Sequence, residues 1–204
     1  SNKLANEYGA CPSFSETQYA KGKMPIDTYK KDVDKFCKNK LKLDWKALRK
    51  DIVSTGLRNS TLTALMPCES SSQISNSTNG IEPPRGFVSI KQSKDGILKQ
   101  IVPEYEKLKD QYELLWDIKE NEGYMQLCAI MQKFVDQSIS TNTHYDPSLF
   151  QGNRVPMKLF LMDILKAYKY GIKTLYYHTT RDGAADEIEE ENNDDACADG
   201  VCKL

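Results

Sequence analysis

The sequence TLTALMPCESSSQISNSTNGIEPPRG, residues 61–86, does most to decide the fold of this chain. Its first six residues favour a short β-strand, which ends at Pro67 because proline cannot donate a hydrogen bond to a sheet. Three serines follow at residues 70–72, and residues 71–76 are predicted to begin a helix. The closing NGIEPPRG, residues 79–86, is predicted to form a rigid turn with Arg85 near its end.

The start of this helix has the chemistry of an anion site. If the helix begins at Ser71, the backbone N–H groups of residues 69–72 are free and point out of its N-terminus. These donors and the helix dipole suit a phosphate without any lysine, and serine hydroxyls add neutral donors. The alternative is a serine-rich cap that serves only the helix. Arg85 could pair with a phosphate or with a carboxylate on a neighbouring element.

Other segments carry ordinary start and stop signals. A helix over 45–56 is predicted to begin at the cap Asp44 and to close at Gly56. Residues 86–102 read as a hairpin that turns at Asp95-Gly96, and residues 173–180 as a strand. Helices are predicted over 103–118, 123–140 and 155–171. Helical spacing predicts two apolar faces, formed by Leu127, Cys128, Met131, Phe134 and Val135 and by Phe160, Leu161, Ile164, Leu165 and Tyr168.

Two adjacent tyrosines, Tyr176 and Tyr177, lie inside the last predicted strand. In an ideal strand they point to opposite faces, each partly buried, and have only a packing role. The alternative is a redox role, in which two phenols packed together pass on an electron and a proton. That arrangement requires a departure from strict alternation along the strand.

The chain changes character after Arg181. Eight of the fourteen residues from Asp182 to Asp195 are acidic, so this segment cannot bury enough apolar surface to offset its ordering entropy. We expect it to be disordered. Cys197 and Cys202 follow it, separated by four residues, and a short loop of this kind can close a disulfide.

The terminal thiols allow several interpretations, of which a structural disulfide is a poor one because it would link the tail only to itself. Metal binding lacks ligands, because His144 and His178 are the only histidines and no second close cysteine pair exists. A mobile dithiol that exchanges with another disulfide is the functional alternative, since a flexible tether of about 20 residues reaches about 25 Å. Two incidental exposed cysteines are the remaining one.

The bulk properties exclude some classes of protein. The 204 residues carry a net charge of −1 and a pI near 6.2, which gives no reason to expect nucleic acid as a partner. No apolar run approaches the roughly 20 residues of a membrane span. Six scattered cysteines are unlike a secreted disulfide framework and favour the reducing cytoplasm. The chain has no initial methionine, and we expect it to be a piece of something longer.

Residues 61–86, TLYYHTTRDG at residues 174–183 and the terminal cysteine pair, in this order, resemble the C-terminal part of the large (alpha) subunit of class I ribonucleotide reductase, of the aerobic bacterial type. The resemblance runs from about residue 6 to the end of the chain. It implies an α/β fold in which residues 1–180 form an incomplete C-terminal portion of a ten-stranded barrel, and residues 181–204 a flexible acidic tail.

The resemblance also implies roles for particular residues. Tyr176 and Tyr177 would relay a radical, and Cys197 and Cys202 would carry reducing equivalents to the active site. A third set would hold the phosphates of the ribonucleotide substrate: Pro67, Cys68, Glu69, Ser70 and Ser71. The implied partners are the rest of the large subunit, thioredoxin or glutaredoxin, and a small subunit that carries a dinuclear-iron tyrosyl radical. No metal or cofactor is expected on this chain.

The sequence departs from the family at two points. Cys68 stands where the family is expected to have serine, and a thiol is the weaker donor. The family's radical-bearing cysteine and reducing cysteine pair have no match here, so we expect the chain alone to be catalytically incomplete. The alternatives are a non-catalytic module that docks onto the small subunit, and a separate dithiol oxidoreductase, which would lack the usual Cys-x-x-Cys at a helix start.

Overall fold

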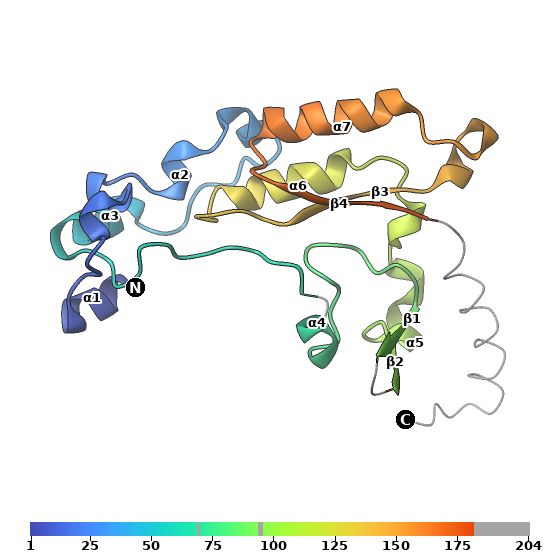
Figure 1. The fold of residues 1–204 in the computed structure, drawn as a ribbon, viewed down its shortest axis with the longest axis horizontal. Helices are drawn as coiled ribbons and strands as arrows, with labels where there is room; N and C mark the ends of the chain where they lie inside the picture. The colour runs from blue at the N-terminus through green and yellow to red at the C-terminus, as the bar shows by residue number, and fades with distance from the viewer. Residues whose placement is uncertain (69, 94–95, 182–204) are drawn as a thin grey trace. The chain divides into compact units, whose positions relative to one another are not determined.

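The computed structural model describes residues 1–181 apart from residues 69, 94 and 95 (Figure 1). Glu69, the hairpin-turn residue Asp95 and the predicted tail with Cys197 and Cys202 therefore lie outside the described residues. The chain divides into two compact units. The first comprises Ser1–Met66, Glu122–Thr141 and Phe160–Tyr176, and the second comprises Pro67–Asn121, Asn142–Leu159 and the chain from Tyr177 onward.

The described residues form α-helices, β-strands and short 3₁₀ turns. The α-helices are α1 (Asn2–Tyr8), α2 (Pro25–Thr28), α3 (Trp45–Thr55), α4 (Ser71–Ile74), α5 (Tyr105–Leu108), α6 (Glu122–Gln132) and α7 (Met157–Tyr170). The strands are β1 (Val88–Ser93), β2 (Gly96–Ile101), β3 (Thr141–Tyr145) and β4 (Leu175–Thr180). Short 3₁₀ turns are η1 (Phe14–Glu16), η2 (Tyr19–Lys21), η3 (Lys31–Lys35), η4 (Lys109–Gln111), η5 (Leu115–Asp117), η6 (Pro147–Leu149) and η7 (Gln151–Asn153).

Predictions that rest on local signals are confirmed. The Asp44 carboxylate accepts hydrogen bonds from the backbone N–H groups of Lys46 and Ala47, at 3.1 and 3.0 Å, and so caps α3. Gly56 closes this helix with a φ of 83°, a left-handed conformation that favours glycine. The hairpin is also confirmed, because β1 and β2 pair antiparallel.

Two helix predictions are wrong in extent. The helix predicted over 123–140 ends at Gln132, whose side-chain amide donates to the carbonyls of Val135 and Gln137 at 3.0 and 3.2 Å and so stabilises a turn. The helix predicted over 103–118 is replaced by α5, η4 and η5. Glu104, with a φ of 55°, interrupts the start of this segment.

The strand predicted over 61–66 is wrong as a regular strand but lies beside another chain segment. Leu65 forms an isolated parallel bridge with Ile139. Its N–H donates to Ser138 at 2.9 Å, and its carbonyl accepts from the N–H of Ser140 at 2.9 Å. Close to it, the Leu62 N–H donates to the Asp136 carboxylate instead of to a neighbouring strand. The Asp136 side chain thus replaces the backbone acceptor that a longer β-ladder would need at Leu62.

The strands β3 and β4 form a second two-stranded sheet. At their starts, the Thr174 hydroxyl donates to the Ile139 carbonyl at 3.0 Å. At their ends, the Arg181 N–H donates to the Tyr145 carbonyl at 3.0 Å. Because these contacts follow the same order along both segments, the strands run parallel, and α7 supplies the crossover that such a pair needs. This β3–α7–β4 unit is typical of α/β folds, although the strands that the structure describes form no closed barrel.

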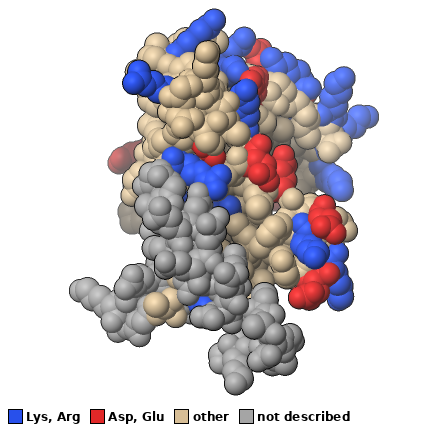
Figure 2. Space-filling view, turned by 90° about the vertical axis from the view of Figure 1, so that its right-hand side faces the viewer, with Lys and Arg blue, Asp and Glu red and all other residues tan. Residues whose placement is uncertain are grey.

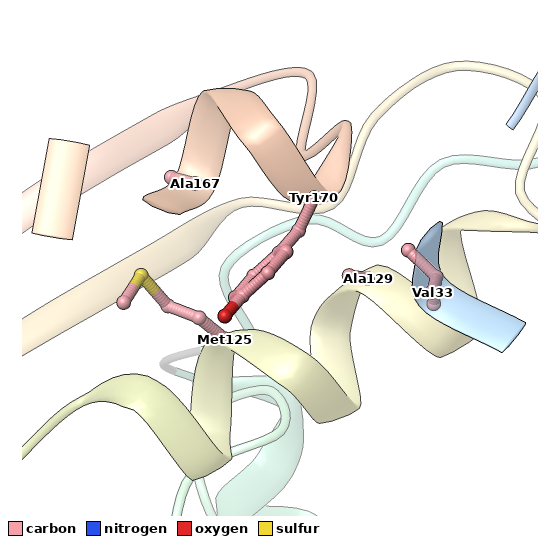
Figure 3. Packing of buried hydrophobic residues seen from close by; sticks show 5 residues of the cluster. All are labelled: Val33, Met125, Ala129, Ala167 and Tyr170. Carbon is pink, nitrogen blue, oxygen red and sulfur yellow. The ribbon is translucent and has the colours of Figure 1, made fainter. Parts of the chain in front are cut away.

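The main core of the first unit lies where η3, α6 and α7 meet. It contains Val33, Met125, Ala129, Ala167 and Tyr170 (Figure 3). Helices α6 and α7 lie side by side, and Tyr170 points from α7 toward α6 (Figures 1 and 3). A second cluster in the same unit contains Tyr19, Met24, Ile52 and Leu57.

The apolar faces predicted for α6 and α7 are largely wrong. Cys128 is fully buried as expected, and Val135 is also buried, but Leu127 and Phe134 are 47% and 43% exposed. The inward positions of α7 are Asp163, Ala167 and Tyr170. By contrast, most of the predicted α7 stripe is exposed, namely Leu161, Ile164, Leu165 and Tyr168. Periodicity located the apolar residues, but it did not show which face has a neighbour.

Candidate functional site

The loop after Pro67 folds as a closed turn in the second unit. As predicted, α4 begins at Ser71. The Cys68 N–H donates to the side-chain oxygen of Asn79 at 2.7 Å, and the Ser72 N–H donates to the Cys68 carbonyl at 2.9 Å. The prediction that the Ser72 N–H is free is therefore wrong, because the turn itself uses it. Ser70 and Ser71 are exposed, whereas Pro67 and Cys68 are half-buried.

The two tyrosines lie within β4, as predicted. Tyr176 and Tyr177 are 47% and 49% exposed, so burial does not alternate between them as it does along a strand with one buried face. The backbone N–H of Tyr177 donates to the side-chain oxygen of Asn142 on β3, at 3.0 Å. A side chain from the neighbouring strand thus holds the backbone at this position.

A group of buried polar residues, which the sequence analysis missed, surrounds β3 in the second unit. All five residues of this strand are buried although their sequence, TNTHY, is polar. Asn121 fixes the middle of the strand, because its side chain donates to the His144 carbonyl at 3.1 Å and accepts from the His144 N–H at 2.9 Å. The Thr143 hydroxyl lies 2.6 Å from Nδ1 of His178 on β4. The available signal was a run of polar residues that contains no Asp, Glu, Lys or Arg, which is less typical of a surface loop.

Glu82 is the acidic member of this buried group. Its carboxylate accepts a hydrogen bond from the Asn142 side-chain amide and lies 3.6 Å from Nε2 of His144. Burial raises the pKa of Glu82, but the contacts with His144 and Asn142 and the charge of Arg85 outweigh it, so the pKa lies below its ordinary value. Glu82 is therefore a charged group held inside the second unit by named partners.

A second buried carboxylate lies where β4 ends. Asp146 accepts hydrogen bonds from the backbone N–H and the hydroxyl of Ser148, at 2.8 and 2.6 Å, and pairs with the Arg181 guanidinium at 3.0 Å. Burial raises the pKa of Asp146, but these donors more than offset it, so the pKa is lowered. The guanidinium also lies over the ring of Trp116, 5.9 Å from its centroid. The Arg181 side chain thus contacts both Asp146 and Trp116.

Within the described residues, neither the surface charge (Figure 2) nor the possible metal ligands indicate a further binding site. Figure 2 shows Lys and Arg side chains close to Asp and Glu on the face that it draws. Within residues 1–181, where described, no group of three or more His, Cys, Asp or Glu residues could hold a metal ion. Among the described residues, Cys11, Cys37, Cys68 and Cys128 do not form disulfides. No helix in the described part of the chain is long and apolar enough to cross a membrane.

These features agree with what comparison with known proteins finds. The model of the family described as "Ribonucleotide reductase, barrel domain" matches residues 1–178, a range that includes the loop after Pro67 and both tyrosines. The chain therefore belongs to the ribonucleotide reductase barrel-domain family, and the resemblance noted in the sequence is confirmed.

The similar proteins include several alpha subunits of ribonucleoside-diphosphate reductase. The chain is 67% identical to that of Haemophilus influenzae over 204 residues, which is 100% of this chain. It is 63% identical to the alpha subunit of ribonucleoside-diphosphate reductase 1 of Escherichia coli and 50% identical to the alpha subunit of Enterobacteria phage T4, each over 207 aligned residues. The chain spans 27% of the length of each of these relatives.

Proposed function

We propose that this chain is the C-terminal part of the large subunit of a ribonucleoside-diphosphate reductase, an oxidoreductase that reduces ribonucleotides to deoxyribonucleotides. The family match over residues 1–178 carries the proposal, because it covers the substrate loop and the tyrosine pair in one continuous region. The rest of the large subunit would complete a ten-stranded α/β barrel and supply the cysteines that this chain lacks. The enzyme would act in the cytoplasm.

The loop of Pro67, Cys68, Glu69, Ser70 and Ser71 would hold the substrate's phosphates. The bond from Cys68 to Asn79 supports this role, because it fixes the loop before any ligand binds and so lowers the ordering cost of binding. The exposed serines offer hydroxyl donors that suit a phosphate. The thiol of Cys68 need not contribute, since its backbone groups form the turn.

Tyr176 and Tyr177 would relay a radical between the two subunits. The small subunit would hold the dinuclear iron and its tyrosyl radical, and this chain would bind neither. Each phenol in turn would give up one electron and one proton and later regain both. Half-exposed phenols on a hydrogen-bonded strand suit this task, because one side is open to the next member of the relay while the backbone is fixed.

The terminal cysteines would supply the reducing equivalents. Two thiols of Cys197 and Cys202 would become one disulfide, while a disulfide in the rest of the large subunit becomes two thiols. Thioredoxin or glutaredoxin would then reduce the tail disulfide in the same way. The acidic composition of the preceding segment supports a tether role.

Turnover of the assembled enzyme tests the proposal. The chain, joined to the rest of the large subunit, is combined with the small subunit, an effector, a ribonucleoside diphosphate and thioredoxin, and deoxynucleotide is measured. We expect Tyr177→Phe to abolish turnover, because a phenyl ring has no O–H to oxidise. Tyr168→Phe, on the exposed side of α7, serves as the matched control. Full activity of Tyr177→Phe would refute the relay.

One observation favours a second candidate, a docking module without chemistry. Leu161, Leu165 and Tyr168 on α7 are more than half exposed, which is unusual for an apolar face without a partner. Such a module would bind the small subunit, yet the assembled enzyme would make no deoxynucleotide. The turnover assay therefore separates the two candidates.

A further inference from the structure

The backbone of Tyr177 is held by the side chain of Asn142. The Tyr177 N–H donates to Oδ1 of Asn142 across the β3–β4 pair, at 3.0 Å. A strand N–H normally donates to a backbone carbonyl of the neighbouring strand, whose position is set by the ladder. Here the acceptor is a side-chain amide, so the position of Tyr177 depends on how that amide is oriented.

The orientation of the Asn142 amide is fixed by Glu82. The amide nitrogen of Asn142 donates to Oε1 of Glu82. If the amide were turned over, its oxygen would face the Glu82 carboxylate and its nitrogen would face the Tyr177 N–H. Both contacts would then be repulsive, since they would bring acceptor against acceptor and donor against donor. Only one orientation satisfies both neighbours.

This arrangement is buried and therefore stiff. Asn142 is 6% exposed and Glu82 is 9% exposed. Nε2 of His144 lies 3.6 Å from the same Glu82 oxygen, and His144 is 4% exposed. Water has little access to replace a lost hydrogen bond at such a site, so removal of one partner leaves the other polar group unsatisfied. The buried position of the Glu82 carboxylate therefore favours its contact with Asn142 over alternatives in solvent.

We propose that Asn142, oriented by Glu82, is a positioning residue that sets the place of Tyr177 in the radical relay. This inference rests on the proposed function. Asn142 does not itself touch the phenol in this role; it acts through the backbone. Transfer between neighbouring groups depends steeply on their geometry, and a displacement of about 1 Å can cost about a hundredfold in rate.

The position of Tyr177 can be measured separately from turnover. 3-Fluorotyrosine is installed at residue 177 of the large subunit, and its ¹⁹F resonance is recorded in the assembled enzyme. A second sample carries the label at Tyr105, in α5, as a reference for global change. We expect Asn142→Ala to shift or broaden the signal at residue 177 and to leave the signal at residue 105 in place.

Turnover provides the second measurement. We expect Asn142→Ala to lower kcat at least about tenfold while KM for the ribonucleotide stays within about twofold, since the substrate loop is not touched. Glu82→Ala should have the same effect, and Glu82→Gln should recover most of the loss, because its amide oxygen can still accept from Asn142. The matched control is Thr143→Val. It removes the hydrogen bond between the Thr143 hydroxyl and the side chain of His178, the residue that follows Tyr177.

The outcomes separate the inference from the proposed function. An unchanged ¹⁹F signal and unchanged kcat in Asn142→Ala would overturn the inference, and so would an equal loss of kcat in Thr143→Val. If Asn142→Ala does not assemble, Asn142→Asp is used, which keeps the acceptor for Tyr177 but places a carboxyl oxygen against Glu82; the same loss is expected. Full activity of Tyr177→Phe would instead refute the relay itself, whatever the ¹⁹F signal shows.

Discussion

Replacing Met125 with alanine tests how α6 and α7 pack. Met125 is fully buried, and it lies in the cluster with Ala129, Ala167 and Tyr170 (Figure 3). Burial of this kind makes a Met→Ala change cost about 2–5 kcal/mol of unfolding free energy, with the larger losses where the cavity cannot collapse. Here collapse is limited, because the Tyr170 hydroxyl donates to the Glu122 carboxylate at 2.7 Å.

An ion pair also restricts relaxation around the cavity. Lys166 on α7 donates to Glu122 on α6 at 2.6 Å, so both helices are tied at the same carboxylate. We therefore expect Met125→Ala to cost about 3.5–5 kcal/mol, in the upper half of the usual range. The value is a large fraction of the stability of an ordinary domain.

The control is Leu165→Ala on the same pair of helices. Leu165 belongs to the apolar stripe that the sequence predicts to be buried, but it is 60% exposed. Only the buried fraction of its side chain contributes, so we expect a loss of about 1 kcal/mol or less. Urea unfolding followed by circular dichroism gives both values, provided that the slope with urea is the same for each variant.

The comparison of these two losses of unfolding free energy tests which face of α7 is packed. If Leu165→Ala cost as much as Met125→Ala, the predicted stripe would be the true packing face and the arrangement in Figure 3 would be wrong. A changed slope in either variant would point to an altered unfolded state or to separate unfolding of the two units, and the comparison would then be made by hydrogen exchange within α6.

Two further predictions concern the buried carboxylates of the second unit. Arg181→Met removes one donor from Asp146 but leaves those of Ser148, so we expect a loss of about 1–2 kcal/mol, measured as faster amide hydrogen exchange at the end of β4; unchanged exchange there would contradict the pairing. Because the folded-state pKa values of Glu82 and Asp146 are lowered, the unfolded chain binds more protons in acid. Their stabilisation should be complete above the ordinary values of 4.5 and 3.8 and should be lost as the pH falls below them, so a urea midpoint that rises on acidification would refute these shifts.

Features set by neighbours in the sequence could be predicted. The ends of α3 depend on Asp44 and Gly56, which act within one helical turn, and both were identified. The strand β4 and the end of α7 at Tyr170, followed by Gly171 with a φ of 78°, depend on similarly local signals. In each case the residue that decides the structure lies next to the element that it limits.

Features set by distant contacts could not be predicted. Apolar spacing marks one side of α7, but the side that is buried with α6 carries Ala167 and Tyr170, which pack in one cluster with Met125 and Ala129. The strand β3 gave no strand signal, since its sequence is polar. Its burial depends on Asn121 and Glu82, which lie 23 and 60 positions from the residues that they bind.

In the loop after Pro67, too, the local feature could be predicted and the distant contacts could not. A helix start at Ser71 follows from the serine cluster, and it was identified. The use of the Ser72 N–H by the Cys68 carbonyl, and of the Cys68 N–H by Asn79, depends on a turn of twelve residues that closes on itself. Helix-start chemistry alone therefore overestimated the donors left for a phosphate, and the exposed serines become the better candidates.

The structure around the tyrosine pair depends both on local strand propensity and on contacts with residues distant in the sequence. Resemblance points to Tyr176 and Tyr177, and the strand propensity of their segment predicts β4, but neither indicates that both are half exposed or that the Asn142 side chain accepts from the Tyr177 N–H. The orientation of Asn142 depends in turn on the Glu82 carboxylate, which accepts from its amide nitrogen. If Tyr177 has the proposed relay role, a residue sixty positions upstream of Asn142 contributes to its position, and a sequence change at Glu82 should be interpreted as a change near Tyr177.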